Sequence, residues 1–208
     1  MKHNRNPRLT LHSCDFSKKA IDVIKSSQEF NSPDMIGQLE ASLWDISSPK
    51  NEDTGKNQLP EGIAPESVDV VILIFIFSAL APTQWQQAIA NIWHLLKPGG
   101  IVLFRDYGRG DLAQVRFRKG RWLEENFYVR GDGTRVYFFD ETELKQLWTG
   151  KGLEDQIQGI KLNDGEVKPK FEIVNFGVDR RLLVNRQRKL KMYRCWLQAR
   201  FRKPELPN

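Results

Sequence analysis

Residues 68–77 are the most strongly apolar stretch of the chain, nearly continuous in Val, Ile, Leu and Phe. Such a run is typical of a strand buried on both faces of a parallel sheet. In residues 82–96 the apolar positions recur at helical spacing, and Lys97-Pro98-Gly99-Gly100 predicts an abrupt end to this helix. Residues 101–104 predict another strand. The middle of the chain therefore predicts a strand, a helix and a strand.

The first third of the chain has a similar pattern. Residues 8–14 predict a strand, and residues 17–27 predict a helix that is capped by its first serine. Residues 36–46 predict a second strand, and the polar residues 47–66, rich in Asn, Gly, Pro and acids, predict a surface loop. This part therefore adds a strand, a helix and a strand.

The last third changes character. Residues 140–148 predict a helix that Gly150 or Gly152 ends. Residues 171–186 and 190–201 predict two long strands, the second with apolar and polar positions in alternation. Alternating strands and helices followed by a hairpin predict a single α/β domain over residues 1–208, with a doubly wound sheet and an antiparallel edge.

The cations are concentrated in the second half of a chain of 208 residues with a net charge of +6. This asymmetry favours a polyanion as partner, although a solvated surface with acidic neighbours would give the same composition. Cys14 and Cys195 are the two cysteines, and their spacing indicates neither a disulfide framework nor a zinc site. We expect a cytoplasmic protein, with mitochondrial or nuclear targeting left open by a basic N-terminus. The longest apolar run is too short to span a bilayer.

Acidic residues follow two of the predicted strands, where ligands bind in open α/β sheets. Asp15 follows the first strand, and its carboxylate suits the ribose hydroxyls of a nucleoside cofactor. Asp45 follows the second and suits the exocyclic amine of an adenine, with Ile46 against the ring. Ile74 and Phe75 lie within the apolar strand near its cofactor end. Helix capping or turn formation is the alternative interpretation of either acid.

Residues 126–135 combine groups that handle nucleic acid. The rings of Phe127 and Tyr128 suit stacking on an extruded base, and the guanidinium groups of Arg130 and Arg135 suit phosphate. A turn between two strands, with the aromatic rings in the core, is the alternative.

The chain resembles the tRNA N3-methylcytidine methyltransferases, which belong to the methyltransferase-like group of class I S-adenosylmethionine enzymes. The Lys-Pro-Gly-Gly turn is common to class I methyltransferases, whereas the strings around Asp106 and Arg130 are specific to the family. The similarity covers about residues 9–203. The motifs are Cys14-Asp15-Phe16-Ser17, Val68-Asp69-Val70-Val71 leading into Leu73-Ile74-Phe75, Leu95-Leu96-Lys97-Pro98-Gly99-Gly100, Leu103-Phe104-Arg105-Asp106-Tyr107-Gly108, Arg116-Phe117 and the run Asn126-Phe127-Tyr128-Val129-Arg130-Gly131-Asp132-Gly133-Thr134-Arg135.

The resemblance implies transfer of a methyl group from S-adenosylmethionine to N3 of a cytidine in a tRNA anticodon loop, typically position 32 of serine, threonine or arginine acceptors. The resemblance also implies that Asp15 is the ribose ligand, that Asp45 and Ile46 contact the adenine, and that Ile74 is a wall of the cofactor pocket. It leaves open the need for an aminoacyl-tRNA synthetase or another RNA-binding protein. The candidates for gripping the base and its phosphate are Asp106, Tyr107, Phe127, Tyr128 and Arg130, with Asp132 as a hydrogen-bond partner for the cytosine amine.

The chain departs from the class I pattern at one point, because it has no first strand followed by a Glu-x-Gly-x-Gly turn. By the family pattern Asp15 ends the second strand, so we expect the first strand, its turn, its helix and a cofactor-covering segment upstream of Met1. Without that central strand, two unpaired strand edges would face each other.

Two explanations compete for this departure. The chain is either an incomplete piece of an active enzyme, or a shortened non-catalytic relative that binds tRNA or regulates a full-length methyltransferase. A nicotinamide dehydrogenase is disfavoured because the chain has no dinucleotide fingerprint.

Overall fold

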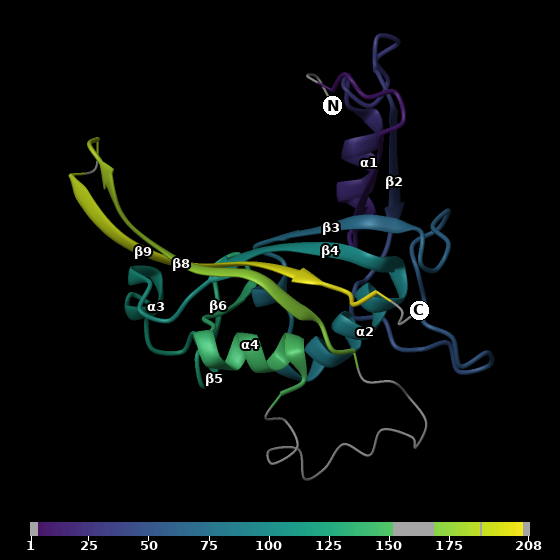
Figure 1. The fold of residues 1–208 in the computed structure, drawn as a ribbon. Helices are drawn as coiled ribbons and strands as arrows, with labels where there is room; N and C mark the ends of the chain where they lie inside the picture. The colour runs from purple at the N-terminus through teal and green to yellow at the C-terminus, as the bar shows by residue number, and fades with distance from the viewer. Residues whose placement is uncertain (1–3, 152–168, 188, 206–208) are drawn as a thin grey trace. The chain divides into compact units, whose positions relative to one another are not determined.

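The computed structural model describes residues 4–151, 169–187 and 189–205. The chain divides into two compact units, residues 1–64 and residues 65–208 (Figure 1). No helix in the described part of the chain is long and apolar enough to cross a bilayer. The single domain expected over the whole chain stays a prediction.

The first unit is a parallel strand pair with one helix. Strand β1 (Thr10–Asp15) pairs with β2 (Gln38–Leu43) in unbroken register, so that Asp15 lies opposite Leu43. Helix α1 (Lys18–Ser26) connects them, and the Ser17 side chain caps it by accepting the Ala20 N–H. The predicted strands and helix are confirmed, and residues 47–66 contain neither helix nor strand.

The second unit is built on a four-stranded sheet with the order β3-β4-β9-β8 (Figure 1). Strands β3 (Val68–Ile74) and β4 (Leu96–Tyr107) are parallel. Strand β9 (Leu190–Arg202) runs antiparallel to β4, and β8 (Glu172–Asn185) runs antiparallel to β9. The expected antiparallel hairpin at one edge of the sheet is therefore confirmed.

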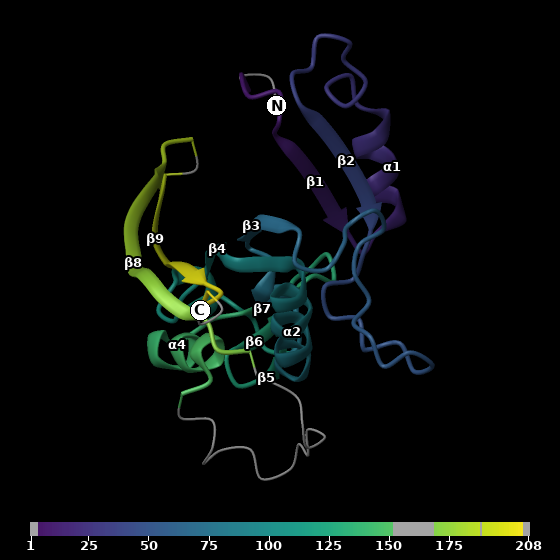
Figure 2. The same cartoon turned by 45° about the vertical axis from the view of Figure 1, so that its right-hand side comes forward.

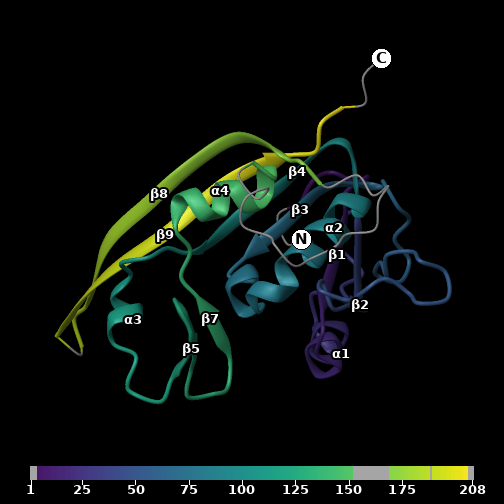
Figure 3. The same cartoon turned by 90° about the horizontal axis from the view of Figure 1, so that it is seen from below.

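Helices and a small second sheet complete this unit. Helix α4 ends at Gly150, whose left-handed backbone (φ 67°) suits glycine at this position. The small sheet has the order β5-β6-β7, and Figure 3 shows two of its strands near α3. The remaining elements are η1 (Phe77–Ala79), η2 (Pro82–Gln84), α2 (Trp85–Leu95), α3 (Leu112–Val115), β5 (Trp122–Glu124), β6 (Phe127–Val129), β7 (Arg135–Tyr137) and α4 (Glu141–Thr149).

An aromatic core covers one face of the four-stranded sheet. Trp148 of α4 stacks on Phe201 of β9, with ring centroids 4.5 Å apart and an interplanar angle of 6°. Phe104 of β4 contacts both rings, at 5.9 Å from Trp148 and 6.0 Å from Phe201. Phe77 adds a fourth ring 5.3 Å from Trp148. These rings are almost fully buried, so the core lies between the sheet and its helices.

The opposite face of β3 corrects one expectation, that this strand is buried on both sides. Val70, Ile72 and Ile74 are 47%, 54% and 53% exposed, whereas Leu73 on the other face is buried. In Figure 2, β3 is the outermost strand of its sheet. Among the described residues, β4 is the one strand paired with β3, and β2 is the one paired with β1. The exposed apolar face of β3 is therefore suited to packing against a further element. The described residues of this unit do not supply that element.

Candidate functional site

Aromatic rings from two strands meet at the carboxyl end of β4. Tyr107 lies opposite Trp196 of β9 in the ladder, so both side chains stand on the same face of the sheet. The Phe75 ring, just after β3, lies 4.7 Å from the Tyr107 ring and 6.3 Å from the Trp196 ring. All three residues are half-buried. The three rings therefore form a partly open aromatic surface at the strand ends.

Three guanidinium groups lie on these rings. Arg105 is centred 4.5 Å from the Trp196 ring, and Arg194 lies 5.2 Å from the same ring. Arg130, from the loop after β6, lies 5.2 Å above Tyr107. Each distance is within the range of a cation–π contact. We call this set the strand-end cluster; its members are Phe75, Arg105, Tyr107, Arg130, Arg194 and Trp196.

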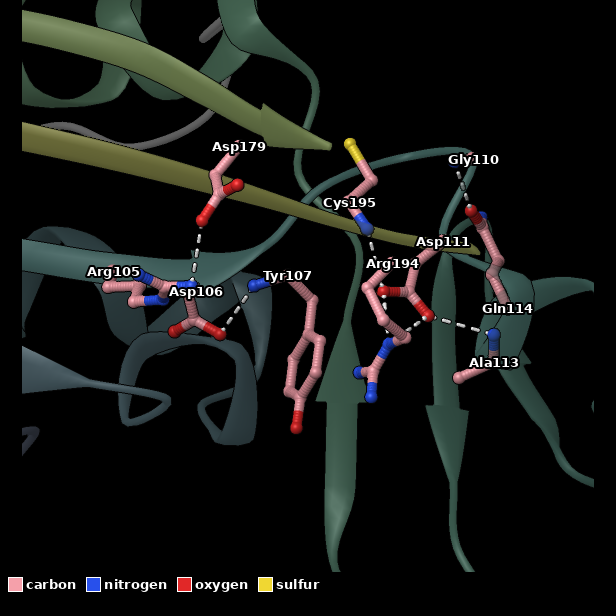
Figure 4. A network of polar contacts seen from close by, with 10 residues as sticks. All are labelled: Arg105, Asp106, Tyr107, Gly110, Asp111, Ala113, Gln114, Asp179, Arg194 and Cys195. Carbon is pink, nitrogen blue, oxygen red and sulfur yellow. Dashed lines mark hydrogen bonds and ion pairs between the residues drawn. The ribbon is translucent and has the colours of Figure 1, made fainter. Parts of the chain in front are cut away.

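Two carboxylates fix Arg105 and Arg194 of the strand-end cluster. Asp111, fully buried, accepts hydrogen bonds from Arg194 Nε at 2.8 Å, from the Cys195 N–H at 3.0 Å and from the Ala113 N–H at 2.8 Å. In Figure 4, Arg194 lies between Tyr107 and Asp111. Asp179 accepts a hydrogen bond from Arg105 Nη2 at 3.0 Å. Arg105 and Arg194 are thus held in place before any ligand arrives.

The backbone at the cluster is strained. Phe75 has a φ of 57°, which is rare for a bulky residue, and its N–H donates to the Arg105 carbonyl at 2.8 Å. Gly108, the residue after Tyr107, is closely packed, because a Cβ added at this position would lie 3.0 Å from Cys195 Sγ. Strained backbone of this kind concentrates at functional sites.

Asp106, a predicted base-gripping residue, lies on the other face of β4. Its carboxylate is fully buried and accepts the Ser78 N–H at 2.8 Å and the Tyr107 N–H at 2.9 Å. Burial raises the pKa of Asp106 to about 6, although these hydrogen bonds oppose the shift. The carboxylate therefore holds the backbone of η1 and of the end of β4 by hydrogen bonds. Contact of Asp106 with a base stays a prediction.

The predicted residues of the 126–135 segment divide between surface and core. Phe127 is buried beside Tyr137, as the alternative interpretation of a turn with core aromatics expects. Tyr128 is half-buried and stacks on Phe117 at 4.6 Å. Asp132 is exposed in the turn and accepts hydrogen bonds from the N–H and hydroxyl of Thr134, which hold the pKa of Asp132 below its usual value. Its contact with a cytosine amine remains a prediction.

The predicted cofactor residues are in both units. Asp15 is the last residue of β1 and Asp45 follows the paired end of β2, and the Trp44 N–H donates to the Asp15 carbonyl at 2.9 Å. Both carboxylates also form turns, Asp15 with the Ser17 N–H and Asp45 with the Ser47 N–H, each at 2.8 Å. Ile46, half-buried, follows Asp45. Both the ligand interpretation and the turn interpretation are compatible with this geometry.

Ile74 is the predicted cofactor residue that lies in the second unit. It ends β3 opposite Arg105 in the parallel ladder, and its side chain stands exposed on the same face as Arg105. Ile74 therefore borders the strand-end cluster.

Three members of the strand-end cluster were not singled out in the sequence: Arg105, Arg194 and Trp196. Alternation along β4 already puts Arg105 and Tyr107 on one face. The positions of Arg194 and Trp196 depend on the register between β4 and β9, which a single sequence does not specify.

Comparison with known proteins defines the class first. A family model described as a methyltransferase domain matches residues 2–102. A SAM-dependent methyltransferase from Methanosarcina mazei has a similar structure, with a TM-score of 0.61 at 18% identity over 95% of this chain and 83% of that chain. A SAM-dependent methyltransferase from Anabaena variabilis gives a TM-score of 0.55 at 14% identity, over 95% and 68%. The chain has the fold of the class I S-adenosylmethionine-dependent methyltransferases.

Curated relatives define the family more narrowly. The chain is 48% identical over 206 residues to the tRNA(Thr) (cytosine(32)-N(3))-methyltransferase of Saccharomyces cerevisiae, covering 99% of this chain and 28% of that protein. It is 44% identical over 208 residues to the tRNA N(3)-cytidine methyltransferase METTL2 of Danio rerio, covering 100% and 50%. Over nearly its whole length the chain is homologous to tRNA N3-methylcytidine methyltransferases, as its motifs predicted, and it spans about a quarter to a half of the length of these two relatives.

Proposed function

We propose that this chain is the methyl-transfer and RNA-gripping part of an enzyme that methylates N3 of cytidine 32 in the anticodon loop of a tRNA. The acceptor is a serine, threonine or arginine tRNA, and the methyl donor is S-adenosylmethionine. The observation that carries the proposal is the strand-end cluster, built within a chain that is 48% identical to a tRNA (cytosine(32)-N(3))-methyltransferase.

Positioning is the main task in this reaction. Cytosine N3 has a lone pair in the plane of the base, so no strong base is needed to make it nucleophilic. A paired or stacked base must first leave its stack, and N3 must then point along the bond between sulfur and the methyl group. The rings of Phe75, Tyr107 and Trp196 suit stacking of an extruded base, while Arg130 suits its phosphate. The strand-end cluster therefore combines a base platform with a phosphate anchor.

The aromatic rings also suit the charge that develops on the base. The cofactor, when bound, supplies an electrophilic methyl group on a positively charged sulfur. As N3 gains the methyl group, the positive charge passes to the cytosine ring, which keeps it or releases it with a proton of the exocyclic amine. The face of an aromatic ring such as Tyr107 attracts a cation. The buried Asp111 and the half-buried Asp179 offset the charge of the neighbouring arginines.

The described residues fit one half of S-adenosylmethionine. Asp15 and Asp45 place carboxylates at the carboxyl ends of adjacent parallel strands, which suits the ribose hydroxyls and the adenine amine. For the methionine half the class uses a glycine-rich turn after a strand, and the sequence contains no Glu-x-Gly-x-Gly. We therefore expect adenosine recognition by this chain and weak affinity for the complete cofactor.

Two measurements test the proposed function. Purified chain is incubated with S-adenosylmethionine and an unmodified serine, threonine or arginine tRNA, and the digested nucleosides are analysed by mass spectrometry for 3-methylcytidine. Cofactor affinity is measured in parallel by calorimetry. Formation of 3-methylcytidine at position 32 supports the enzyme. A folded chain that binds tRNA but binds neither S-adenosylmethionine nor adenosine, and forms no 3-methylcytidine, favours the non-catalytic alternative.

A further inference from the structure

The segment that leads into the small sheet has an exposed tryptophan among cations. Trp122, the first residue of β5, is 64% exposed. Residues 112–125 contain four basic residues and two carboxylates, Glu124 and Glu125. All four basic residues are exposed, namely Arg116, Arg118, Lys119 and Arg121. This surface, which we call the Trp122 platform, lies outside the predicted site residues.

Ring contacts connect the strand of the Trp122 platform with the strand-end cluster. Trp122 lies opposite Tyr128 in the antiparallel ladder of β5 and β6, so the two side chains stand on one face. The Tyr128 ring lies 5.8 Å from Phe138, and Phe138 lies 5.8 Å from Tyr107. In addition, Arg121 Nη1 donates to the carbonyl of Arg130 at 3.2 Å. The strand that presents Trp122 is therefore linked to the strand-end cluster through Tyr128, the buried Phe138 and the Arg121–Arg130 hydrogen bond.

We propose that Trp122 is a stacking platform for an unpaired nucleotide that neighbours the target cytidine in the RNA loop, with the surrounding cations contacting its phosphates. This inference rests on the proposed function and adds a binding position outside the strand-end cluster. Stacking on an exposed ring is independent of base identity, because every base has an aromatic face. The Trp122 platform would thus hold the loop open beside the extruded base without reading its sequence.

Charge distinguishes RNA from protein as the occupant. A tryptophan at the centre of a protein interface is usually surrounded by residues with few charges. Around Trp122 four exposed cations outnumber two exposed carboxylates, Glu124 and Glu125, and this excess of positive charge suits a polyanion. The combination of a ring with cations is the pattern by which proteins hold single-stranded nucleic acid.

The test measures binding of the 208-residue chain to a fluorescently labelled anticodon stem-loop RNA across a range of salt concentrations. Trp122→Ala should weaken binding about tenfold and leave the salt dependence unchanged, because stacking releases no counterions. Trp122→Phe should keep most of the affinity. Lys119→Ala should lower the slope of log affinity against log salt by about 0.7. Leu123→Ala is the matched control, because Leu123 is the next residue of the same strand and is a 41% exposed apolar side chain.

The outcomes separate this inference from the proposed function. If wild type binds the loop and Trp122→Ala binds equally well, the Trp122 platform fails as an RNA site and a protein contact becomes its explanation, while the proposed function stands. An equal loss in Leu123→Ala would also overturn it, since both effects would then reflect disturbance of β5. If wild type does not bind the stem-loop, the RNA-gripping part of the proposed function fails as well.

Discussion

Arg130 is the residue that connects the segment of residues 126–135 with the other members of the strand-end cluster. Its guanidinium lies 5.2 Å above the Tyr107 ring, in contact with the surface proposed for the base. Arg130→Ala should weaken tRNA binding about tenfold and lower methylation, because it removes both a cation–π partner and a phosphate anchor. Binding to labelled tRNA and nucleoside analysis check this.

Two variants control the Arg130 experiment. Arg130→Lys keeps the charge and should recover only part of the affinity, since an ammonium group lacks the planar face of a guanidinium. Lys18→Ala removes one exposed cation from α1 and should leave tRNA affinity nearly unchanged. Unchanged binding and methylation in Arg130→Ala would remove Arg130 from the site.

Asp106 makes the stability of the protein depend on pH. Burial raises its pKa to about 6 from 3.8, so the folded state binds a proton more readily than the unfolded state between these values. The free energy of unfolding should therefore decrease as pH rises from about 4 to about 6, by roughly 3 kcal/mol from this group alone. Asp106→Asn should remove this part of the pH dependence.

Urea unfolding at several pH values measures the Asp106 contribution as the difference between wild type and Asp106→Asn. Parallel curves for the two proteins across this pH range would show that the carboxyl group is not the source. Near-ultraviolet circular dichroism verifies that the variant keeps the aromatic core.

At the scale of elements, the residue directly after β9 stabilises the end of α2 through its buried side chain. Lys203 Nζ donates to the carbonyls of Trp93 at 3.0 Å and Leu96 at 2.9 Å, and to Glu66 Oε1 at 2.7 Å. A cation at this end of a helix satisfies carbonyls that have no partner within the helix. Lys203→Met keeps the aliphatic stem and should cost about 2 kcal/mol, because it removes this donor.

Denaturant unfolding of Lys203→Met checks this capping role. Arg200→Met changes an exposed residue on the same strand and should alter the free energy of unfolding by less than about 0.5 kcal/mol. Equal effects of the two substitutions would contradict a specific role for the ammonium group.

The elements that the sequence predicted well have strong local signals. The Ser17 cap, the Gly150 end of α4 and the alternation along β9 each place an element where the structure has it. The face of β3 was predicted wrongly, because continuous apolarity indicates cover on both sides but does not show whether the chain supplies it. The strand-end cluster was predicted in part, since Arg194 and Trp196 reach it through strand register.

At the scale of the whole molecule, the two units expose strand edges that the class I fold would pair. Among the described residues β1 and β3 each have one neighbouring strand, and β3 also has exposed apolar side chains on one face. Such edges and faces are stabilised when a further strand and helix cover them. We therefore infer that full activity needs a strand, a glycine-rich turn and a helix in addition to the described elements.

The most direct test replaces the 206 matching residues of the Saccharomyces cerevisiae relative with this chain, so that all remaining segments of the relative are present. The chimera is incubated with S-adenosylmethionine and unmodified tRNA, and 3-methylcytidine at position 32 is quantified by mass spectrometry. We predict methylation at that position, and its loss when Tyr107→Ala removes the central ring of the strand-end cluster. A chimera that folds, binds S-adenosylmethionine and tRNA, and still forms no 3-methylcytidine would contradict the proposed function.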